Sequence, residues 1–311
     1  MKVLDQFFTE NSALYHGDSA EVMRGIPNES VGLSVFSPPF SSLYTFSNSE
    51  RDVSNVKDLK EFMKQYRFMM KELFRIMKPG RIVAVHTMDL TTGIGRDGFL
   101  SVIDFRGVLI RLMQKLGFYY HSEIKVWKDP VVEVTRTKNI QLLYHQFKKD
   151  STISRQSLPD TITIFRKPGK NEEPVMHYQD LEEFVKKNNR EPKNKHEKSM
   201  IMTNKEWAKL ASPVWMDINQ SKTLNFRHGK AENDERHISA LQLDVIERVI
   251  SLWSNPEDII FSPFGGVGSE PYQAVKMGRK AISIELKESY FKQSTKNVEE
   301  LENKQDQLTL F

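Results

Sequence analysis

The fold of this chain is decided by residues 258–268, whose sequence is DIIFSPFGGVG. A short apolar run with the pattern of a buried strand passes directly into a loop with three glycines, and a helical pattern follows over 270–277. Glycines at such a junction let the backbone approach a ligand closely, and a helix N-terminus offers free N–H groups to an anion. Strand, loop and helix in this order predict the first unit of a nucleotide-type binding site.

The strand pattern that comes next, over 280–285, ends in Glu285. An acidic side chain at this place accepts hydrogen bonds from the hydroxyls of a ribose. The loop lacks the Gly-Lys-Ser/Thr of a P-loop, and its glycines do not have the spacing of a dinucleotide site. We therefore expect a cofactor that carries adenosine but no pyrophosphate. The alternative is a tight turn beside an unrelated acid.

Strand patterns and helical patterns alternate along most of the chain. We expect strands at 31–36, 82–85, 124–127 and 161–165, and helices at 59–77, 105–116, 181–187, 237–253 and from 289 to a frayed tail near 305. This alternation predicts an α/β, Rossmann-like fold with a mostly parallel sheet and helices on both faces. The periodicity weakens over 170–212, which predicts a small insertion there that can extend to part of 130–158.

The composition excludes several classes of protein. The 311 residues contain no cysteine, which excludes disulfides and thiolate chemistry and suits a cytoplasmic protein. No apolar run is long enough to span a membrane, and the N-terminus lacks the pattern of a secretory signal. The eight histidines show neither His-x-His nor HExxH pairing, so we expect no metal site.

The net charge of +4 is modest, but the middle of the chain is strongly basic. Between residues 136 and 170 there are eight basic residues and two acidic ones, and 186–209 is basic as well. Such segments predict a face presented to a polyanion, with a solvated lysine-rich surface as the plain alternative. The residues that we expect to contact phosphates are Arg136, Lys138, Lys148, Lys149 and Arg155.

A second motif, Ser37-Pro38-Pro39-Phe40, follows the strand pattern at 31–36. Two adjacent prolines fix the turn and remove two N–H donors, so the Ser37 hydroxyl and the Pro38 carbonyl can both accept hydrogen bonds from one amino group. Phe40 offers a face on which a flat ring can stack. These features predict a receptor for the exocyclic amine of a flipped adenine or cytosine. The alternative is a simple turn that ends a strand.

Taken together, the two motifs resemble those of the DNA amino-methyltransferases that use S-adenosylmethionine, in the β group of that family. In that group the catalytic tetrapeptide precedes the target-recognition region, which precedes the cofactor motif, and the order here is the same. The resemblance covers about 1–169 and 213–300. It implies a catalytic half at 1–169, a target-recognition insertion at 170–212 and a cofactor-binding half at 213–311.

The resemblance also implies roles for individual residues. The tetrapeptide Ser37, Pro38, Pro39 and Phe40 is the catalytic motif. The residues implied for cofactor binding are Asp18, His237, Leu241, Pro263, Phe264, Gly266, Gly268, Ser269 and Glu285. Of these, Asp18 is implied to contact the adenine, Phe264 the adenosine and methionine parts, and Glu285 the ribose.

The expected function is therefore site-specific methylation of double-stranded DNA, with cytosine N4 favoured over adenine N6 because Ser-Pro-Pro is commoner among cytosine enzymes. The chain departs from the family at Ser262, where an Asp is usual, and at Ser269-Glu270, where Thr-Thr is usual. Ser262 keeps open a DNA-binding protein of the same fold that has lost catalysis. Methylation of RNA or a free nucleotide is a third interpretation. The sequence also leaves open a homodimer and a restriction endonuclease partner.

Overall fold

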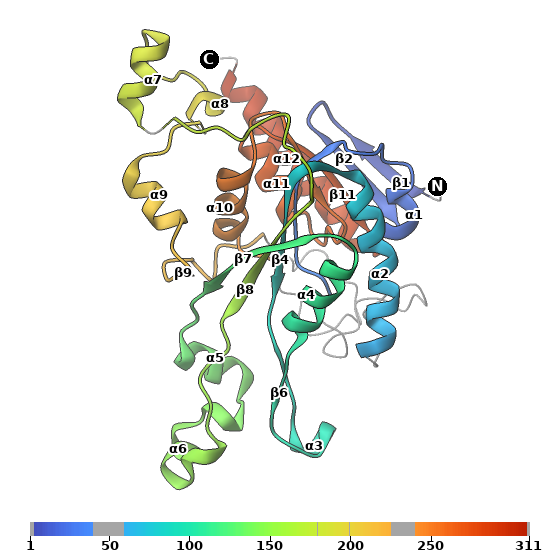
Figure 1. Cartoon of the computed structure of the whole chain (residues 1–311), viewed down its shortest axis with the longest axis vertical. Helices are drawn as coiled ribbons and strands as arrows, with labels where there is room; N and C mark the ends of the chain where they lie inside the picture. Colours follow the sequence, from blue (N-terminus) through green and yellow to red (C-terminus); the bar gives the residue numbers. More distant parts are fainter. Residues whose placement is uncertain (1–2, 40–58, 179, 199, 225–239, 310–311) are drawn as a thin grey trace.

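The computed structural model describes residues 3–39, 59–178, 180–198, 200–224 and 240–309. Within these residues nine strands form one sheet in the order β1-β2-β11-β10-β3-β4-β8-β7-β9 (Figure 1). Their bounds are β1 (Val3–Phe8), β2 (Ser12–Gly17), β3 (Val31–Phe36), β4 (Met77–Thr87), β7 (Tyr119–Val126), β8 (Asp160–Arg166), β9 (Val214–Trp215), β10 (Ile259–Ser262) and β11 (Lys280–Glu285). Strands β1 and β8 run antiparallel to their neighbours, and the other pairings are parallel. The predicted α/β fold with a mostly parallel sheet is confirmed.

Helices cover both faces of this sheet. The long helices are α2 (Leu59–Ile76), α4 (Phe105–Lys115), α10 (Leu243–Trp253) and α12 (Glu288–Thr309), and the short ones are α1 (Ser19–Met23), α3 (Ile94–Asp97), α5 (Pro130–Thr137), α6 (Tyr144–Lys149), α7 (Leu181–Asn188), α8 (Lys195–Lys198), α9 (Asn204–Leu210) and α11 (Ser269–Lys276). Helices α2 and α4 share one apolar cluster with the sheet, whereas α10 and α11 share the cluster on the other face. All six residues of β3 are buried, as expected for a strand covered on both sides.

The predicted elements agree with the structure at most positions. The strands expected at 31–36 and 280–285 have those bounds, and the one expected at 82–85 is the end of the longer β4. Two differences concern polar segments. The N-terminal hairpin β1–β2 has no counterpart among the predicted strands, and α12 continues to Thr309 instead of fraying near 305.

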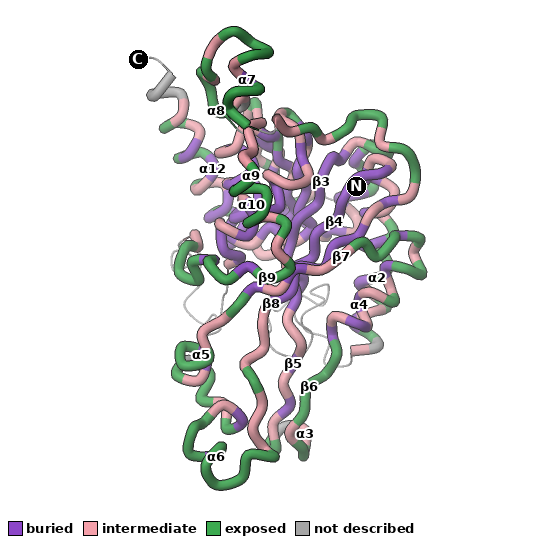
Figure 2. The backbone as a smooth tube through the Cα atoms, turned by 60° about the vertical axis from the view of Figure 1, so that its left-hand side comes forward, coloured by how far each residue is buried: buried purple, intermediate pink, exposed green. Residues whose placement is uncertain are grey.

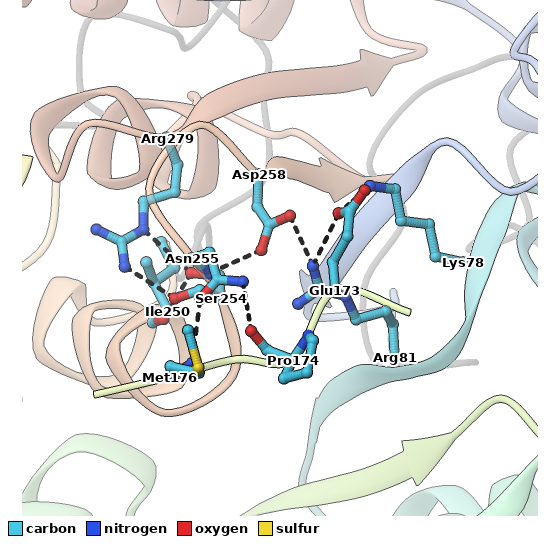
Figure 3. A network of polar contacts seen from close by, with 10 residues as sticks. All are labelled: Lys78, Arg81, Glu173, Pro174, Met176, Ile250, Ser254, Asn255, Asp258 and Arg279. Carbon is cyan, nitrogen blue, oxygen red and sulfur yellow. Dashed lines mark hydrogen bonds and ion pairs between the residues drawn. The ribbon is translucent and has the colours of Figure 1, made fainter. Parts of the chain in front are cut away.

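The parallel strands begin at one end of the sheet, here called the amino edge. A network of polar contacts joins the chain segments at this edge (Figure 3). Arg81 of β4 is 1% exposed and its Nη2 lies 2.8 Å from Oδ1 of Asp258, which precedes β10. Lys78 pairs with Glu173 at 2.6 Å, and the Asn255 side chain donates to the Pro174 carbonyl. The chain from 170 onward is thus attached at this edge, and α7 and α8 lie at the same end of the molecule (Figure 1). The role of 170–212 in target recognition stays a prediction.

The parallel strands end at the opposite end of the sheet, here called the carboxyl edge. Two projections extend from this edge. Residues 88–104, here called the hairpin arm, follow β4 and contain β5 (Leu90–Thr91), α3 and β6 (Val102–Ile103). Residues 127–159, here called the helical lobe, connect β7 to β8 and contain α5, α6 and two 3-10 turns. Both extend in the same direction, and Figure 2 shows mostly exposed or intermediate residues along them, in contrast to the buried centre of the sheet.

Candidate active site

The two sequence motifs meet at the carboxyl edge of the sheet. Strands β2, β11, β10 and β3 are consecutive and parallel, so the residues that follow them lie side by side. The glycine loop follows β10, and Ser37 follows the adjacent β3. The rings of Phe36 and Phe264 confirm this proximity, because their centroids are 5.7 Å apart. The edge of an open parallel sheet at which strands end is where such folds bind ligands.

The glycine loop is packed on one side and open on the other. A Cβ at Gly265 would lie 2.2 Å from Ser283 Oγ, and one at Gly268 would lie 2.3 Å from Ser294 Oγ. Gly266 differs, because a Cβ there would meet nothing within 4 Å. Gly266 and Gly268 have φ values of +51° and +88°, which only glycine adopts at little cost. The loop therefore presents backbone to open space.

Glu285 is held against this loop. Its Oε2 accepts a hydrogen bond from the Gly266 N–H at 2.6 Å, and its Oε1 accepts from the Lys287 N–H at 2.8 Å. A carboxylate oxygen can accept more than one hydrogen bond. The carboxylate is thus oriented by the loop that it flanks.

Buried polar groups without partners surround the loop. The hydroxyls of Ser262 and Ser269 are buried and have no hydrogen-bond partner among the described residues. Buried hydroxyls normally have a partner, and a bound polar ligand would supply one. Burial raises the pKa of the Glu270 carboxyl from 4.5 to about 8, and the nearby Glu285 carboxylate adds to the rise. The residues present fit a cofactor with polar groups at the glycine loop.

Asp18 lies beside the same loop, but its carboxylate also caps a helix. It accepts hydrogen bonds from the N–H groups of Ala20 and Glu21 at the start of α1. The neighbouring Ser19 hydroxyl donates to the Pro263 carbonyl at 2.5 Å and so ties α1 to the loop. A contact between Asp18 and an adenine stays a prediction.

Three other predicted residues are not brought to the site by the described structure. Leu241 is 5% exposed and belongs to the apolar cluster beneath β3 and β10. Phe40 and His237 lie outside the described residues. Their roles stay predictions.

Ser37 has a partner that the motifs did not predict. Its Oγ lies 3.0 Å from Nδ1 of His86, a buried residue at the end of β4. On the other side of the imidazole, Nε2 lies 3.3 Å from Oδ2 of Asp160 at the start of β8. Asp160 in turn contacts Lys128 Nζ at 2.5 Å. The signal for His86 was its place at the end of a predicted strand, but Asp160 becomes its neighbour only because β8 pairs antiparallel with β4.

The predicted phosphate contacts divide into two groups. Lys138, Lys148 and Lys149 are exposed on the helical lobe. Arg155 is different, because its side chain is 12% exposed, donates to Gln141 and lies 3.9 Å from a Glu133 oxygen. It holds the lobe together, which corrects the expectation of a surface cation. The side chain of Arg136 lies outside the described residues.

The described residues contain neither a candidate metal site nor a candidate membrane span. Over the described ranges, no group of three or more His, Asp or Glu side chains is arranged to hold a metal ion. In the same part of the chain, no helix is both long and apolar enough to cross a membrane.

A mostly parallel sheet with a glycine loop at one central strand end and a proline-fixed turn at the next defines a Rossmann-like protein with a nucleotide-type pocket. Comparison with known proteins narrows this class. Residues 31–296 match the family described as DNA methylase, and the chain belongs to that family. The resemblance to the DNA amino-methyltransferases is confirmed, whereas the assignment to the β group stays a prediction.

The curated relatives are distant and mostly longer. Type II methyltransferase M.BamHI from Bacillus amyloliquefaciens is 23% identical over 281 residues, which cover 90% of this chain but 56% of the relative. The chain thus spans little more than half the length of that protein. Type II methyltransferase M.PvuII from Proteus hauseri is 23% identical over 298 residues, covering 91% of this chain and 82% of the relative.

Solved structures show the same fold. PvuII DNA methyltransferase, described as cytosine-N4-specific, superposes with a TM-score of 0.60 at 19% identity and covers 97% of this chain and 95% of its own. A Thermus thermophilus protein, provisionally described as a DNA modification methylase and solved with S-adenosyl-L-methionine, gives 0.64 at 20% identity, with 93% of each chain covered. Both likenesses confirm the fold.

Proposed function

We propose that this protein transfers a methyl group from S-adenosylmethionine to the exocyclic amine of a base flipped out of double-stranded DNA, with cytosine N4 favoured over adenine N6. One observation carries the proposal: the Ser37 turn and the glycine loop follow adjacent parallel strands, with the Phe36 and Phe264 rings 5.7 Å apart. An amine held at the turn would face a methyl donor held at the loop. Such positioning contributes several kcal/mol to a two-reactant step.

Each motif has a part in this proposal. When bound, S-adenosylmethionine supplies an electrophilic methyl group on a sulfonium. Glu285 accepts the ribose hydroxyls, and the open backbone at Gly266 faces the cofactor. Ser37 and the Pro38 carbonyl accept the two N–H bonds of the amine, which localises the nitrogen lone pair. Pro39 fixes the turn and Phe40 stacks on the flipped base.

The two projections are the proposed DNA interface. The hairpin arm and the helical lobe both leave the edge at which Ser37 lies, and the lobe exposes Lys138, Lys148 and Lys149. Phosphate contacts from these lysines would hold the duplex beside the site. We therefore favour the 130–158 part of the predicted target-recognition region over α7 and α8, which lie at the opposite edge.

The proposal is tested by Ser37→Ala. Transfer of labelled methyl groups to duplex DNA should fall about 100-fold or more, because the amine loses its hydrogen-bond acceptor in the transition state. Affinity for S-adenosylmethionine, measured by calorimetry, should be unchanged. Ser30→Ala is the matched control, since Ser30 precedes the same strand at its other end and bonds to the Pro27 carbonyl.

The control should transfer methyl groups at the wild-type rate. Undiminished transfer by Ser37→Ala would refute the role of Ser37. If the wild-type protein binds DNA but no S-adenosylmethionine, the second candidate is correct: a DNA-binding protein of this fold without catalysis, as the buried Ser262 in place of the usual acid would favour. Nucleoside mass spectrometry of the product DNA distinguishes N4-methylcytosine from N6-methyladenine.

A further inference from the structure

A continuous line of polar contacts runs across four neighbouring strands from Ser37. It passes from Ser37 Oγ to His86 Nδ1 at 3.0 Å, from His86 Nε2 to Asp160 at 3.3 Å, and from Asp160 to Lys128 at 2.5 Å. These residues lie at the ends of β3, β4, β8 and β7, all at the carboxyl edge. Except for Ser37, which is partly buried, each side chain of the line is at most 13% exposed. Such a line is shielded from water and has one end at the proposed amine site.

The charges along the line favour one position for the proton of the His86 imidazole. Burial raises the pKa of Asp160, but His86 and Lys128 outweigh burial and bring it down to about 2, so the carboxylate is ionised near neutral pH. A carboxylate facing Nε2 favours the tautomer with its proton on Nε2. Nδ1 then accepts the hydrogen bond from the Ser37 O–H. The lone pairs of Ser37 Oγ are left to accept from the amine.

The proposed reaction produces a proton that this line can receive. The amine nitrogen forms a bond to the methyl carbon, and the carbon–sulfur bond breaks with its electron pair going to sulfur. The nitrogen is then positively charged and must lose one proton. Ser37 Oγ can take that proton while giving its own to His86 Nδ1, which leaves an imidazolium beside the Asp160 carboxylate. Charge and atoms balance without another reactant.

We propose that His86 takes up the product proton through Ser37, and that Asp160 and Lys128 hold the imidazole in the orientation and tautomer that this requires. The inference rests on the proposed function. In this scheme His86 does not touch the base, so it is a positioning and proton-accepting residue that acts through Ser37. Histidine suits the role because its ring has two nitrogens, of which one can hold a proton while the other accepts one.

The other charged groups near the line are engaged elsewhere. Lys125 of β7 donates to the Thr161 hydroxyl at 3.0 Å and pairs with Glu123 at 3.2 Å. Arg106 of α4 is bonded to the same Glu123. Within the line itself, the charged neighbours of His86 and Asp160 are Asp160 and Lys128, respectively.

The test uses single-turnover methyl transfer measured at a series of pH values from about pH 5.5 to 9. In the wild type the rate should fall on the acidic side, because an imidazolium cannot accept a proton. His86→Gln should lower the rate about 100-fold and remove this acidic fall. A combined Ser37→Ala and His86→Gln variant should be no slower than Ser37→Ala alone, since His86 acts through Ser37.

Two measurements separate this role from a merely structural one. His86→Gln should keep the cofactor affinity and melting temperature of the wild type. His121→Gln is the matched control, because His121 is exposed on β7 and its ring lies 2.9 Å from the hydroxyl of the adjacent Ser122. An unchanged acidic fall in His86→Gln, or additive losses in the combined variant, would overturn the inference while leaving the proposed function in place.

A spectroscopic measurement tests the line without any activity. Nitrogen-15 spectra of the histidine rings should show the His86 proton on Nε2. The Asp160→Asn substitution should change the chemical shift of this nitrogen. A proton on Nδ1 at neutral pH would refute the inference even in a protein that transfers no methyl groups. Absence of all methyl transfer by the wild type, with the expected His86 tautomer, would instead count against the proposed function.

Discussion

The same parallel strands run from the amino edge of the central sheet to its carboxyl edge, but the polar groups at the two edges differ in their hydrogen bonds and ion pairs. At the amino edge, Arg81 and Asp258 form a buried ion pair at 2.8 Å that joins β4 to β10. At the carboxyl edge, the hydroxyls of Ser262 and Ser269 are buried without partners among the described residues, and Gly266 faces open space. The Arg81–Asp258 pair at the amino edge stabilises the fold, whereas the Ser262 and Ser269 hydroxyls at the carboxyl edge are available to a ligand. Stability and binding are thus separated along the strands.

Breaking the amino edge should have the largest effect, and it should fall on stability alone. Arg81→Met leaves the buried Asp258 carboxylate without its cation, and we expect a loss of about 3 kcal/mol in the free energy of unfolding. The methyl-transfer rate per folded molecule should be unchanged. Urea denaturation measures the first quantity and a single-turnover assay the second.

Lys78→Met is the control for this change, because the Lys78 side chain is 29% exposed and its partner Glu173 is 61% exposed. It should cost less than about 1 kcal/mol. Equal losses for the two variants, or a slower methyl transfer by Arg81→Met, would contradict the division between the edges.

At the carboxyl edge, Glu270 predicts a pH dependence of stability. Its pKa is raised from 4.5 to about 8 in the folded protein, so the folded state binds a proton that the unfolded state has lost between these values. The stabilising contribution is complete below pH 4.5 and is lost as the pH rises through about 8. Glu270→Gln should remove this decline and make the cofactor-free protein more stable at alkaline pH, by a few kcal/mol.

Urea titrations at several pH values measure this effect. Asp160 affects stability in the opposite direction and in a different pH range. Its contribution to the free energy of unfolding is lost as the pH falls from 3.8 toward about 2. Glu182→Gln, on the exposed surface of α7, should leave the pH profile of stability as it is. A profile for Glu270→Gln that matched the wild type would show that Glu270 is ionised in the folded protein.

A third change fills the open space at the glycine loop. Gly266→Asn keeps a residue that tolerates the positive φ, but it adds a side chain where a Cβ meets nothing within 4 Å. Affinity for S-adenosylmethionine should fall about tenfold, which corresponds to about 1.4 kcal/mol. Gly98→Asn is the matched control, because Gly98 has φ +80° and equally open surroundings on the hairpin arm. Unchanged affinity in Gly266→Asn would move the cofactor away from the loop.

The smallest effect is expected from single charges on the proposed DNA interface. Replacing Lys148 and Lys149 with Gln should weaken DNA binding several-fold and reduce the salt dependence by about one unit of slope per lost phosphate contact. The same changes at Lys186 of α7 and Lys195 of α8, which are exposed at the amino edge of the sheet, should leave both quantities unchanged. Fluorescence anisotropy at several salt concentrations measures both. A larger effect from the second pair would restore α7 and α8 as the target-recognition region.

Sequence reasoning succeeded where a pattern is local. Strands β3 and β11 are continuous apolar runs with clear ends, and their bounds were predicted to the residue. The hairpin strand β1 was missed because most of its residues are exposed and the polar pair Asp5-Gln6 interrupts its apolar residues. The glycine loop and the proline turn were likewise found because each is a short, contiguous motif.

The remainder of the site depends on strand order, which no local pattern contains. His86 and Asp160 are 74 residues apart along the chain, between positions 86 and 160, and meet because β8 returns antiparallel beside β4. Arg155 was misjudged for a related reason. Its charge is visible in the sequence, but the proximity of Glu133 and Gln141 that buries it is not.

The insertion of β8 between β4 and β7 has a consequence for how relatives can diverge. The helical lobe leaves the sheet near Lys128 and returns at Asp160, and the contact of 2.5 Å between these two residues fastens its ends together. Length or sequence can therefore change throughout the loop of chain between them without moving the strand ends that carry the chemistry. Under the proposed function, exchange of this one closed segment would change the DNA sequence that is recognised and leave Ser37 and the glycine loop in place.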